Sequence, residues 1–326
     1  MDYDIINRKI DMKVRNCMKK TVSVLLALMS VFCLFACGTE EETKNKEGYT
    51  FTDDLEREVT VESCERTAAL LGSYADIWML AGGEICASAD DAWDEFDLDL
   101  AEDTVNLGNT KELNLEALLA AQPDFVLAST NTAQNLEWQE TLEKAGITVA
   151  YFDVSDLDGY LNMLKICTEL TGMPERYKQY GSDIASQIGE IIERNSDKEA
   201  QTILLMRASA TGIYAKNSKT TVLGNMLSDF GCINIADSDE SLLENISVES
   251  IVLADPDKIF FIQTGDNLEG IEKNIENMFN ENPLWGELTA VRENKVYLME
   301  KKLFNLKPNA RWAEAYEKLE AILYAE

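Results

Sequence analysis

The sequence predicts an α/β protein of two related lobes joined by a single long α-helix, and two observations carry this prediction. A twelve-residue pattern occurs twice, at Glu116–Leu127 and at Glu249–Phe260; each copy runs from a Glu through an apolar helix and Pro-Asp into an apolar strand. Proline ends such a helix because it lacks an N–H and disfavours helical conformation in the preceding residue. Between the copies, residues 174–195 show the apolar period of a long helix. The alternative is that a common helix–turn–strand sequence pattern occurs twice by chance, but the equal Glu-to-Pro spacing favours duplication.

The first lobe is expected to alternate strands and helices after a small hairpin. Residues 51–61 alternate around a turn, which is typical of a hairpin. Gly72-Ser73 is expected to cap the first helix, because a serine hydroxyl accepts hydrogen bonds from first-turn N–H groups. The acidic and aromatic stretch Asp90–Phe96 is expected to form a loop. The other expected elements are strands at 66–71, 84–87, 125–128 and 147–152 and helices at 74–81 and 137–145.

The second half is expected to contain the connecting helices and another α/β lobe. A helical period covers 157–170, and after Gly172 a helix starts near Pro174 and continues to about Asn195, a length of roughly 30 Å. The second lobe is expected to contain strands at 202–206, 258–262 and 295–298 and helices at 221–230 and 311–324. The predicted boundaries are 1–36 for a signal peptide, 37–50 for a tether, 51–156 for the N-terminal lobe, 157–198 for bridging helices and 199–326 for the C-terminal lobe.

The N-terminus carries the pattern of an export signal. Lys19-Lys20 precedes the apolar run Thr21–Phe35, and a small residue stands before Cys37. Leu34-Phe35-Ala36-Cys37 resembles a bacterial lipobox, so we expect 18–36 to be the true signal and Cys37 to be lipidated. A plain membrane-anchoring helix or an ordinary signal with a nearby Cys are the alternatives. The body is expected outside the cytoplasm, held by a lipid anchor to the outer face of the cell membrane through the polar tether.

Composition excludes several classes of function. The chain has 29 Lys+Arg against 59 Asp+Glu, a net charge of −30, which argues against nucleic acid or an anionic membrane surface as a partner. It has no histidine, which excludes imidazole-based catalysis and imidazole-ligated metal sites. The four cysteines of the body are expected to be buried thiols, with two disulfides as the alternative: Cys64, Cys86, Cys167 and Cys232.

The order of several motifs resembles the substrate-binding proteins of ABC importers for ferric siderophores, haem and cobalamin. The motifs are the lipobox, Thr52–Val59, Leu71–Ser73, the two Glu…Pro-Asp units, the single bridging helix, Asn282–Trp285, Ala290–Tyr297 and Lys307–Trp312. The resemblance covers nearly everything after residue 50. It implies a bilobal clamshell of two Rossmann-like lobes, a monomer with no resident cofactor or metal, and no enzymatic activity. It also implies a membrane permease as partner and a small-molecule metal chelate as ligand.

The resemblance also implies a role for the repeated glutamates. In that family one exposed Glu on each lobe docks onto arginines of the permease, and Glu116 and Glu249 occupy those places here. Two carboxylates on separate lobes would meet matched basic pockets and so fix orientation. The alternative is that each Glu only complements the dipole of its own helix, and both effects can coexist.

Ligand-binding residues are expected at the carboxyl ends of the strands, where open α/β sheets bind ligands. The candidates are Ser73, Tyr74, Trp93, Ser129, Arg207, Tyr214, Gln263, Phe304 and Arg311. If the ligand is anionic, the guanidinium groups of Arg207 and Arg311 are suited to bind it bidentately. Lys216 is expected to be a solvated charge in a loop.

The expected function is therefore a receptor that captures a metal chelate between the lobes and passes it to a permease. A preassembled chelate needs no ligand from the protein, so a ferric siderophore comes first, followed by a corrinoid or haem. One alternative is a surface sensor with the same fold. The other is an enzyme that uses acids such as Asp90-Asp91 and Asp94-Glu95, but no nucleophile–base pair accompanies them.

Overall fold

The structure is a computed structural model that describes residues 48–238, 241–244 and 247–324. The expected signal at 1–36, the lipidation site Cys37 and the tether up to Glu47 lie outside the described residues. Gly48–Glu326 form one compact unit. In the described part of the chain, no helix combines the length and the apolar run needed to cross a membrane.

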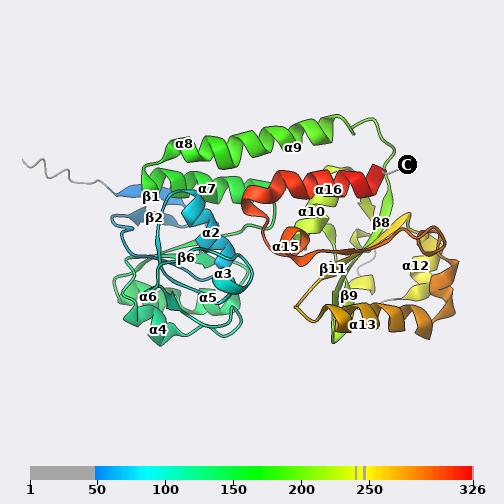
Figure 1. Cartoon of the computed structure of the whole chain (residues 1–326), viewed down its shortest axis with the longest axis horizontal. Coiled ribbons are helices and arrows are strands. Elements are labelled where there is room, and N and C mark those ends of the chain that lie inside the picture. The colour runs from blue at the N-terminus through cyan, green and yellow to red at the C-terminus, as the bar shows by residue number, and fades with distance from the viewer. Residues whose placement is uncertain (1–47, 239–240, 245–246, 325–326) are drawn as a thin grey trace, which may run out of the picture. The chain divides into compact units, whose positions relative to one another are not determined.

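The first half of this unit is built on a five-stranded parallel sheet in the order β5-β4-β3-β6-β7. Figure 1 shows its strand β6 between α2 and α5. Helices cover both faces of the sheet, so β6 is buried along its whole length and reads as a continuous apolar run. The strands are β3 Thr67–Ala69, β4 Ile85–Ser88, β5 Val105–Asn106, β6 Phe125–Ser129 and β7 Thr148–Phe152. The helices are α2 Gly72–Leu80, α3 Asp91–Asp94, α4 Leu115–Ala120, α5 Ala133–Glu137 and α6 Gln139–Lys144. We call this half the N-terminal lobe.

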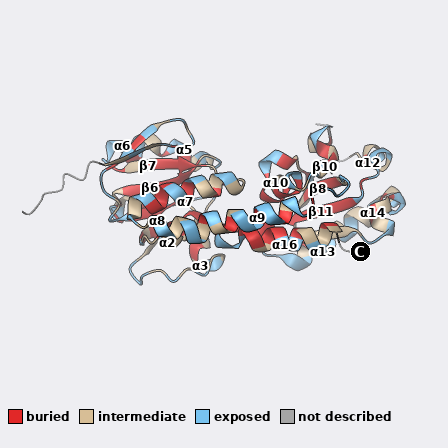
Figure 2. Ribbon diagram, turned by 90° about the horizontal axis from the view of Figure 1, so that it is seen from above, coloured by how far each residue is buried: buried red, intermediate tan, exposed pale blue. Residues whose placement is uncertain are grey.

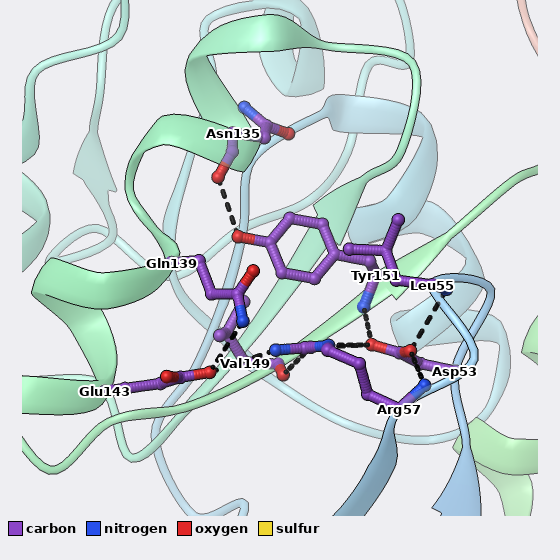
Figure 3. Close-up of polar contacts among 8 residues, drawn as sticks. All are labelled: Asp53, Leu55, Arg57, Asn135, Gln139, Glu143, Val149 and Tyr151. Atoms are coloured by element: carbon purple, nitrogen blue, oxygen red, sulfur yellow. Dashed lines mark hydrogen bonds and ion pairs between the residues drawn. The ribbon is translucent and has the colours of Figure 1, made fainter.

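The predicted hairpin precedes this sheet, with β1 (Tyr49–Thr52) antiparallel to β2 (Glu58–Val61). Its turn is pinned to β7 by Asp53, whose side chain is fully buried (Figure 3). The Asp53 carboxylate accepts hydrogen bonds from the backbone N–H groups of Arg57 and Tyr151, at 3.0 and 3.2 Å, and pairs with the Arg57 guanidinium at 2.6 Å. The guanidinium also donates to the carbonyl of Val149 and lies 4.8 Å from the centre of the Tyr151 ring. The Thr52–Val59 motif is therefore a structural anchor.

Replacing Asp53 with Ala is expected to lower the free energy of unfolding by about 3 kcal/mol, because it leaves a half-buried guanidinium and buried N–H groups without their acceptor. Urea unfolding followed by circular dichroism measures this. Glu140→Ala is the control: it removes a fully solvated pair with Lys144 and should cost less than about 0.5 kcal/mol. Equal stability of the two variants would contradict the anchor.

Two helical segments connect the lobes. α7 (Leu157–Thr171) ends at Gly172, which has a left-handed φ of 71°. The predicted long helix is present, but it is divided: α8 (Pro174–Tyr177) passes through a π-helical turn at Lys178–Ser182 into α9 (Asp183–Glu193). α8 and the π turn pack on α7, whereas α9 packs on the C-terminal helix α16. The packing partner of the long helix thus changes at the π turn.

The second half, here called the C-terminal lobe, has a parallel sheet in the order β10-β8-β11-β12, with β9 antiparallel on β8. Figure 2 shows that buried residues line β8 and β11 as they line β6 and β7. The strands are β8 Thr202–Ser209, β9 Gly212–Ala215, β10 Ile233–Asn234, β11 Lys258–Gln263 and β12 Val296–Met299. The helices are α10 Val222–Asp229, α11 Ser241–Glu244, α12 Val248–Ala254, α13 Leu268–Glu281, α14 Thr289–Arg292, α15 Lys301–Phe304 and α16 Trp312–Tyr324. Short 3₁₀ turns occupy Ser218–Thr220, Ile235–Asp237, Pro283–Glu287 and Asn309–Arg311.

Two local predictions were wrong. α2 begins at Gly72 with no side-chain cap, so Ser73 lies inside the helix; the Gly72 N–H is satisfied instead by the Asp91 carboxylate at 2.8 Å. Asp91 belongs to the short helix α3, which occupies part of the stretch predicted to be a loop. The cap of α2 is therefore supplied by tertiary structure.

Candidate functional site

The carboxyl ends of both sheets carry buried polar atoms that find no hydrogen-bond partner among the described residues. Three such atoms lie there: Ser88 Oγ at the end of β4, Arg207 Nε in β8 and Thr264 Oγ1 just after β11. The others among the described residues are Asn135 Nδ2, Asn309 Oδ1 and Trp312 Nε1. Buried polar atoms of this kind are rare in folded proteins, because each one costs free energy. The three at the predicted edge indicate a place where a ligand or solvent completes the bonds.

The hairpin β8–β9 presents two cations on one face. Arg207 lies directly opposite Tyr214 in the antiparallel register, and the backbone N–H of Lys216 donates to Leu205 at 2.9 Å. Because side chains alternate along a strand, Arg207, Tyr214 and Lys216 share one face. Burial lowers the pKa of Arg207; burial and the nearby charge of Arg207 lower the pKa of Lys216. Tyr214 is 58% exposed beside them.

A third cation, Lys307, comes from the segment between α15 and α16. This segment is held against the N-terminal lobe by Asn309, whose side-chain amide donates to the carbonyl of Ser73 at 2.9 Å and to the carboxylate of Asp76 at 2.8 Å. Asn309 is fully buried and has a left-handed φ of 51°. Burial lowers the pKa of Lys307, an effect that Asp153 and Asp91 oppose and Arg207 reinforces. Lys307 lines a crevice together with Asp76 and Glu95 of the N-terminal lobe, and it lies within electrostatic range of Arg207.

We call Arg207, Lys216 and Lys307 the cation triad. Within the described ranges, none of the three side chains has a carboxylate within ion-pair distance, although the chain has 59 acidic residues and Lys301 and Arg311 are both paired. Partly buried cations without a counter-charge cost stability, and such costs are concentrated at functional sites. The arrangement is suited to binding an anionic ligand.

The N-terminal lobe contributes a polar edge and one aromatic residue. The Ser129 hydroxyl at the end of β6 accepts a hydrogen bond from the Asn131 N–H at 3.1 Å, and the Asn131 amide donates to the Asp153 carboxylate at 2.8 Å. Trp93 lies half-buried on α3. Burial raises the pKa of the neighbouring Asp91 to about 6, although its hydrogen bond from Gly72 lowers it. No group of three His, Cys, Asp or Glu side chains able to hold a metal ion occurs in the part of the chain that the structure describes.

Several predicted site residues lie elsewhere or have other partners. Tyr74 is fully buried and its hydroxyl donates to the carbonyl of Phe152 at 2.7 Å, so it packs the core; Phe304 is also buried. Arg311, at the end of the 3₁₀ turn before α16, is bound through both Nε and Nη2 to Glu314 of α16, at 2.7 and 2.9 Å. The Gln263 amide donates to the carbonyl of Gly265. Sequence reasoning missed Lys307 as a ligand candidate and treated Lys216 as solvated.

The repeated glutamates occupy matching positions. Glu116 is the second residue of α4, and Glu249 is the second residue of α12; both are exposed. The residue two positions before each Glu caps the helix. The side chain of Asn114 accepts from the Ala117 N–H at 3.0 Å, and that of Ser247 accepts from the Ser250 N–H at 3.3 Å. The two carboxylates therefore project from equivalent helix starts.

The Pro-Asp turns after these helices are equally alike. Gln122 and Asp255, which precede the prolines, have left-handed φ values of 50° and 39°. The next aspartate then binds the start of the neighbouring central strand: the Asp124 carboxylate accepts from the Arg66 N–H at 3.0 Å, and that of Asp257 from the Thr202 N–H at 2.7 Å. The duplication predicted from spacing extends to individual hydrogen bonds.

Comparisons with known proteins agree with this architecture. The model of the periplasmic binding protein family matches residues 68–303. The iron-uptake system-binding protein of Bacillus subtilis (strain 168) is 25% identical over 298 residues, covering 86% of this chain and 91% of that protein. The high-affinity heme uptake system protein IsdE of Staphylococcus aureus (strain MRSA252) is 23% identical over 228 residues, covering 69% of this chain and 76% of that protein. The crystal structure of Staphylococcus aureus SirA complexed with staphyloferrin B has the same fold, with a TM-score of 0.65 and 17% identity over 84% of this chain and 98% of that one.

These matches confirm the predicted α/β bilobal fold class and the resemblance to substrate-binding proteins of importers. Two sheets with polar carboxyl ends and two equivalent exposed glutamates are the structural counterpart of that resemblance. The chain therefore belongs to the periplasmic binding protein family, whose members are binding proteins of transporters and not enzymes.

Proposed function

We propose that this chain is a lipid-anchored receptor that captures an anionic metal chelate between its lobes and delivers it to an ABC-importer permease. The cation triad carries the proposal, because a chain of net charge −30 has ample carboxylates, yet none of the three cations forms an ion pair among the described residues and Arg207 Nε has no hydrogen-bond partner there. A bound anion would supply the missing counter-charge. Trp93, Ser129, Tyr214 and Gln263 complete the proposed site, and Cys37 is the proposed lipidation site.

A ferric siderophore is the preferred ligand, ahead of haem and a corrinoid. One relative is named for iron uptake and another for haem uptake, and the SirA structure contains staphyloferrin B. The chain has no histidine to bind haem iron, so an axial ligand would have to be Tyr or Met. A preassembled ferric chelate needs no such ligand, and its acidic groups match the triad.

Tryptophan-fluorescence titration of the body that follows Cys37 tests the proposal, with ferric citrate, ferrioxamine B, haemin and cyanocobalamin as probes. We expect saturable quenching by an anionic iron complex at submicromolar concentration. Trp93 is the one tryptophan that is not buried, so Trp93→Phe should remove most of the saturable change. Free tryptophan controls for light absorbed by the probes. Saturation by none of the probes would count against chelate import and favour a sensor for another ligand.

A further inference from the structure

One lysine of the C-terminal lobe binds acids of both lobes. Lys301, the first residue of α15, pairs with Asp266 of its own lobe at 2.6 Å and with Glu95 of the N-terminal lobe. Lys302 extends the contact towards Asp97, at 3.4 Å. Glu95 and Asp97, at the end of the acidic stretch that begins at Asp90, therefore lie against two consecutive lysines that are some 200 residues away in the sequence.

The Lys301–Glu95 pair is shielded from solvent. The two side chains are 15% and 16% exposed, whereas Asp266 is 82% exposed. Burial lowers the pKa of Lys301, but its hydrogen bonds to Asp266 and Glu95 outweigh this and raise it. An ion pair with little exposure is screened less by salt than a surface pair and depends more strongly on its geometry.

The N-terminal partner is held firmly within its own lobe. Glu95 follows α3 directly, and α3 is tied to α2 by the hydrogen bond from the Gly72 N–H to Asp91. α3 also carries Trp93. A crevice of about 290 Å³ lies beside the pair and is lined by residues of both lobes, including Glu95, Lys302 and Lys307. A contact at this place cannot survive a separation of the lobes.

The connecting helix contains a point at which such a movement can be absorbed. The π turn at Lys178–Ser182 lies where the helix leaves α7 and begins to pack on α16. The Tyr160 hydroxyl donates to the Tyr180 carbonyl at 2.7 Å, inside the π turn. π turns interrupt the regular hydrogen bonding of a helix and are frequent at functional sites.

We infer that Lys301 and Glu95 form an interlobe clasp that favours the close arrangement of the lobes and thereby slows release of the ligand. The clasp itself needs no ligand; its effect on release rests on the proposed function. Breaking it lowers the fraction of molecules in the close arrangement, so bound ligand escapes faster. Lys301 and Glu95 act as positioning residues, because they hold α3 and α15 and do not themselves contact the ligand.

The test compares Glu95→Gln with Asp266→Asn, because each variant removes one acid from the same lysine but only the first removes an interlobe contact. A non-natural amino acid with a ketone side chain is introduced at the exposed positions 144 and 276, and a spin label is attached to each ketone. The distance between the two labels reports the distance between the lobes in the unliganded protein. We expect Glu95→Gln to broaden this distribution towards longer distances and Asp266→Asn to leave it unchanged. Lys301→Met should match Glu95→Gln, and combining the two should add nothing.

Dissociation of ferric citrate, followed by stopped flow, provides the second readout. We expect about a fivefold faster release from Glu95→Gln and no change from Asp266→Asn. Parent-like distances in Glu95→Gln would overturn the clasp, and so would equal broadening in Glu95→Gln and Asp266→Asn. If ferric citrate does not bind the parent protein, the proposed function loses support while the distance measurement still decides the clasp.

Discussion

Replacing Arg207 or Lys307 with Met is expected to weaken binding of an anionic ferric chelate by about 100-fold each. The two side chains lie in a partly desolvated region, and burial lowers the pKa of both. Removing one member of a desolvated ion pair typically costs about 2–5 kcal/mol, and 100-fold corresponds to about 2.7 kcal/mol. Isothermal titration calorimetry measures the affinity directly.

The same substitutions are expected to raise stability in the absence of ligand. A partly buried cation with no ion-pair partner destabilises the folded state, so a Met of similar length should increase the free energy of unfolding by about 1 kcal/mol. Weaker binding with greater stability is the mark of a site retained for function. A purely structural residue would lose stability when it is replaced.

Arg311→Met is the matched control for this prediction. Its guanidinium is already bound by Glu314 in the first turn of α16, so its replacement should leave affinity within about twofold of the parent. The affinity for an uncharged corrinoid should also stay unchanged when a residue of the triad is replaced. If Arg207→Met retains parental affinity for every anionic chelate that binds, the triad is not the ligand site.

The double variant Glu116→Ala, Glu249→Ala is expected to abolish uptake while leaving ligand affinity unchanged. Both carboxylates are exposed at equivalent helix starts, so each is available to a basic pocket on the permease. Losing two charge-assisted contacts, each worth about 2 kcal/mol or more, would weaken docking by about 1,000-fold. Single variants should retain partial uptake.

The uptake measurement uses proteoliposomes that contain the cognate permease and internal ATP, with the receptor variant and a radiolabelled iron chelate added outside. Glu140→Ala and Glu276→Ala are controls, because they remove exposed glutamates from the same two lobes without touching α4 or α12. Fluorescence titration of each variant keeps ligand binding separate from docking. Undiminished transport by the double variant would refute the docking role of both glutamates.

The elements that the sequence predicted correctly are those with local causes. Proline and glycine positions placed the ends of α7 and of the two Pro-Asp units, and apolar periodicity placed the central strands. α13 was missed although Ile271, Ile275, Met278 and Phe279 follow a helical period, because its mostly polar composition hid the stripe. The π turn has no local signature, since it reflects a change of packing partner.

The candidate site also contains some residues that could be predicted from local sequence and others that could not. Exposure of Glu116 and Glu249 follows from their places at capped helix starts, and the Arg311–Glu314 pair follows from spacing on a helix. Lys307 is different, because its position depends on the bond between Asn309 and Ser73, which are 236 residues apart. Tyr74, on α2, is different as well, since the Phe152 carbonyl that accepts from its hydroxyl belongs to β7, 78 residues away in the sequence.

The sequence by itself determined the two related lobes, the bridging helix and the equivalent glutamates, because repeats, prolines and apolar periods act over a few residues. Only the tertiary structure decided which cations lack a partner. Whether a charge is paired depends on the acids that the fold brings near it, and net charge says nothing about those distances. The triad and the Lys301–Glu95 clasp both illustrate this: Lys301 is ion-paired with Glu95, whereas Lys307, six residues later, has no ion pair among the described residues.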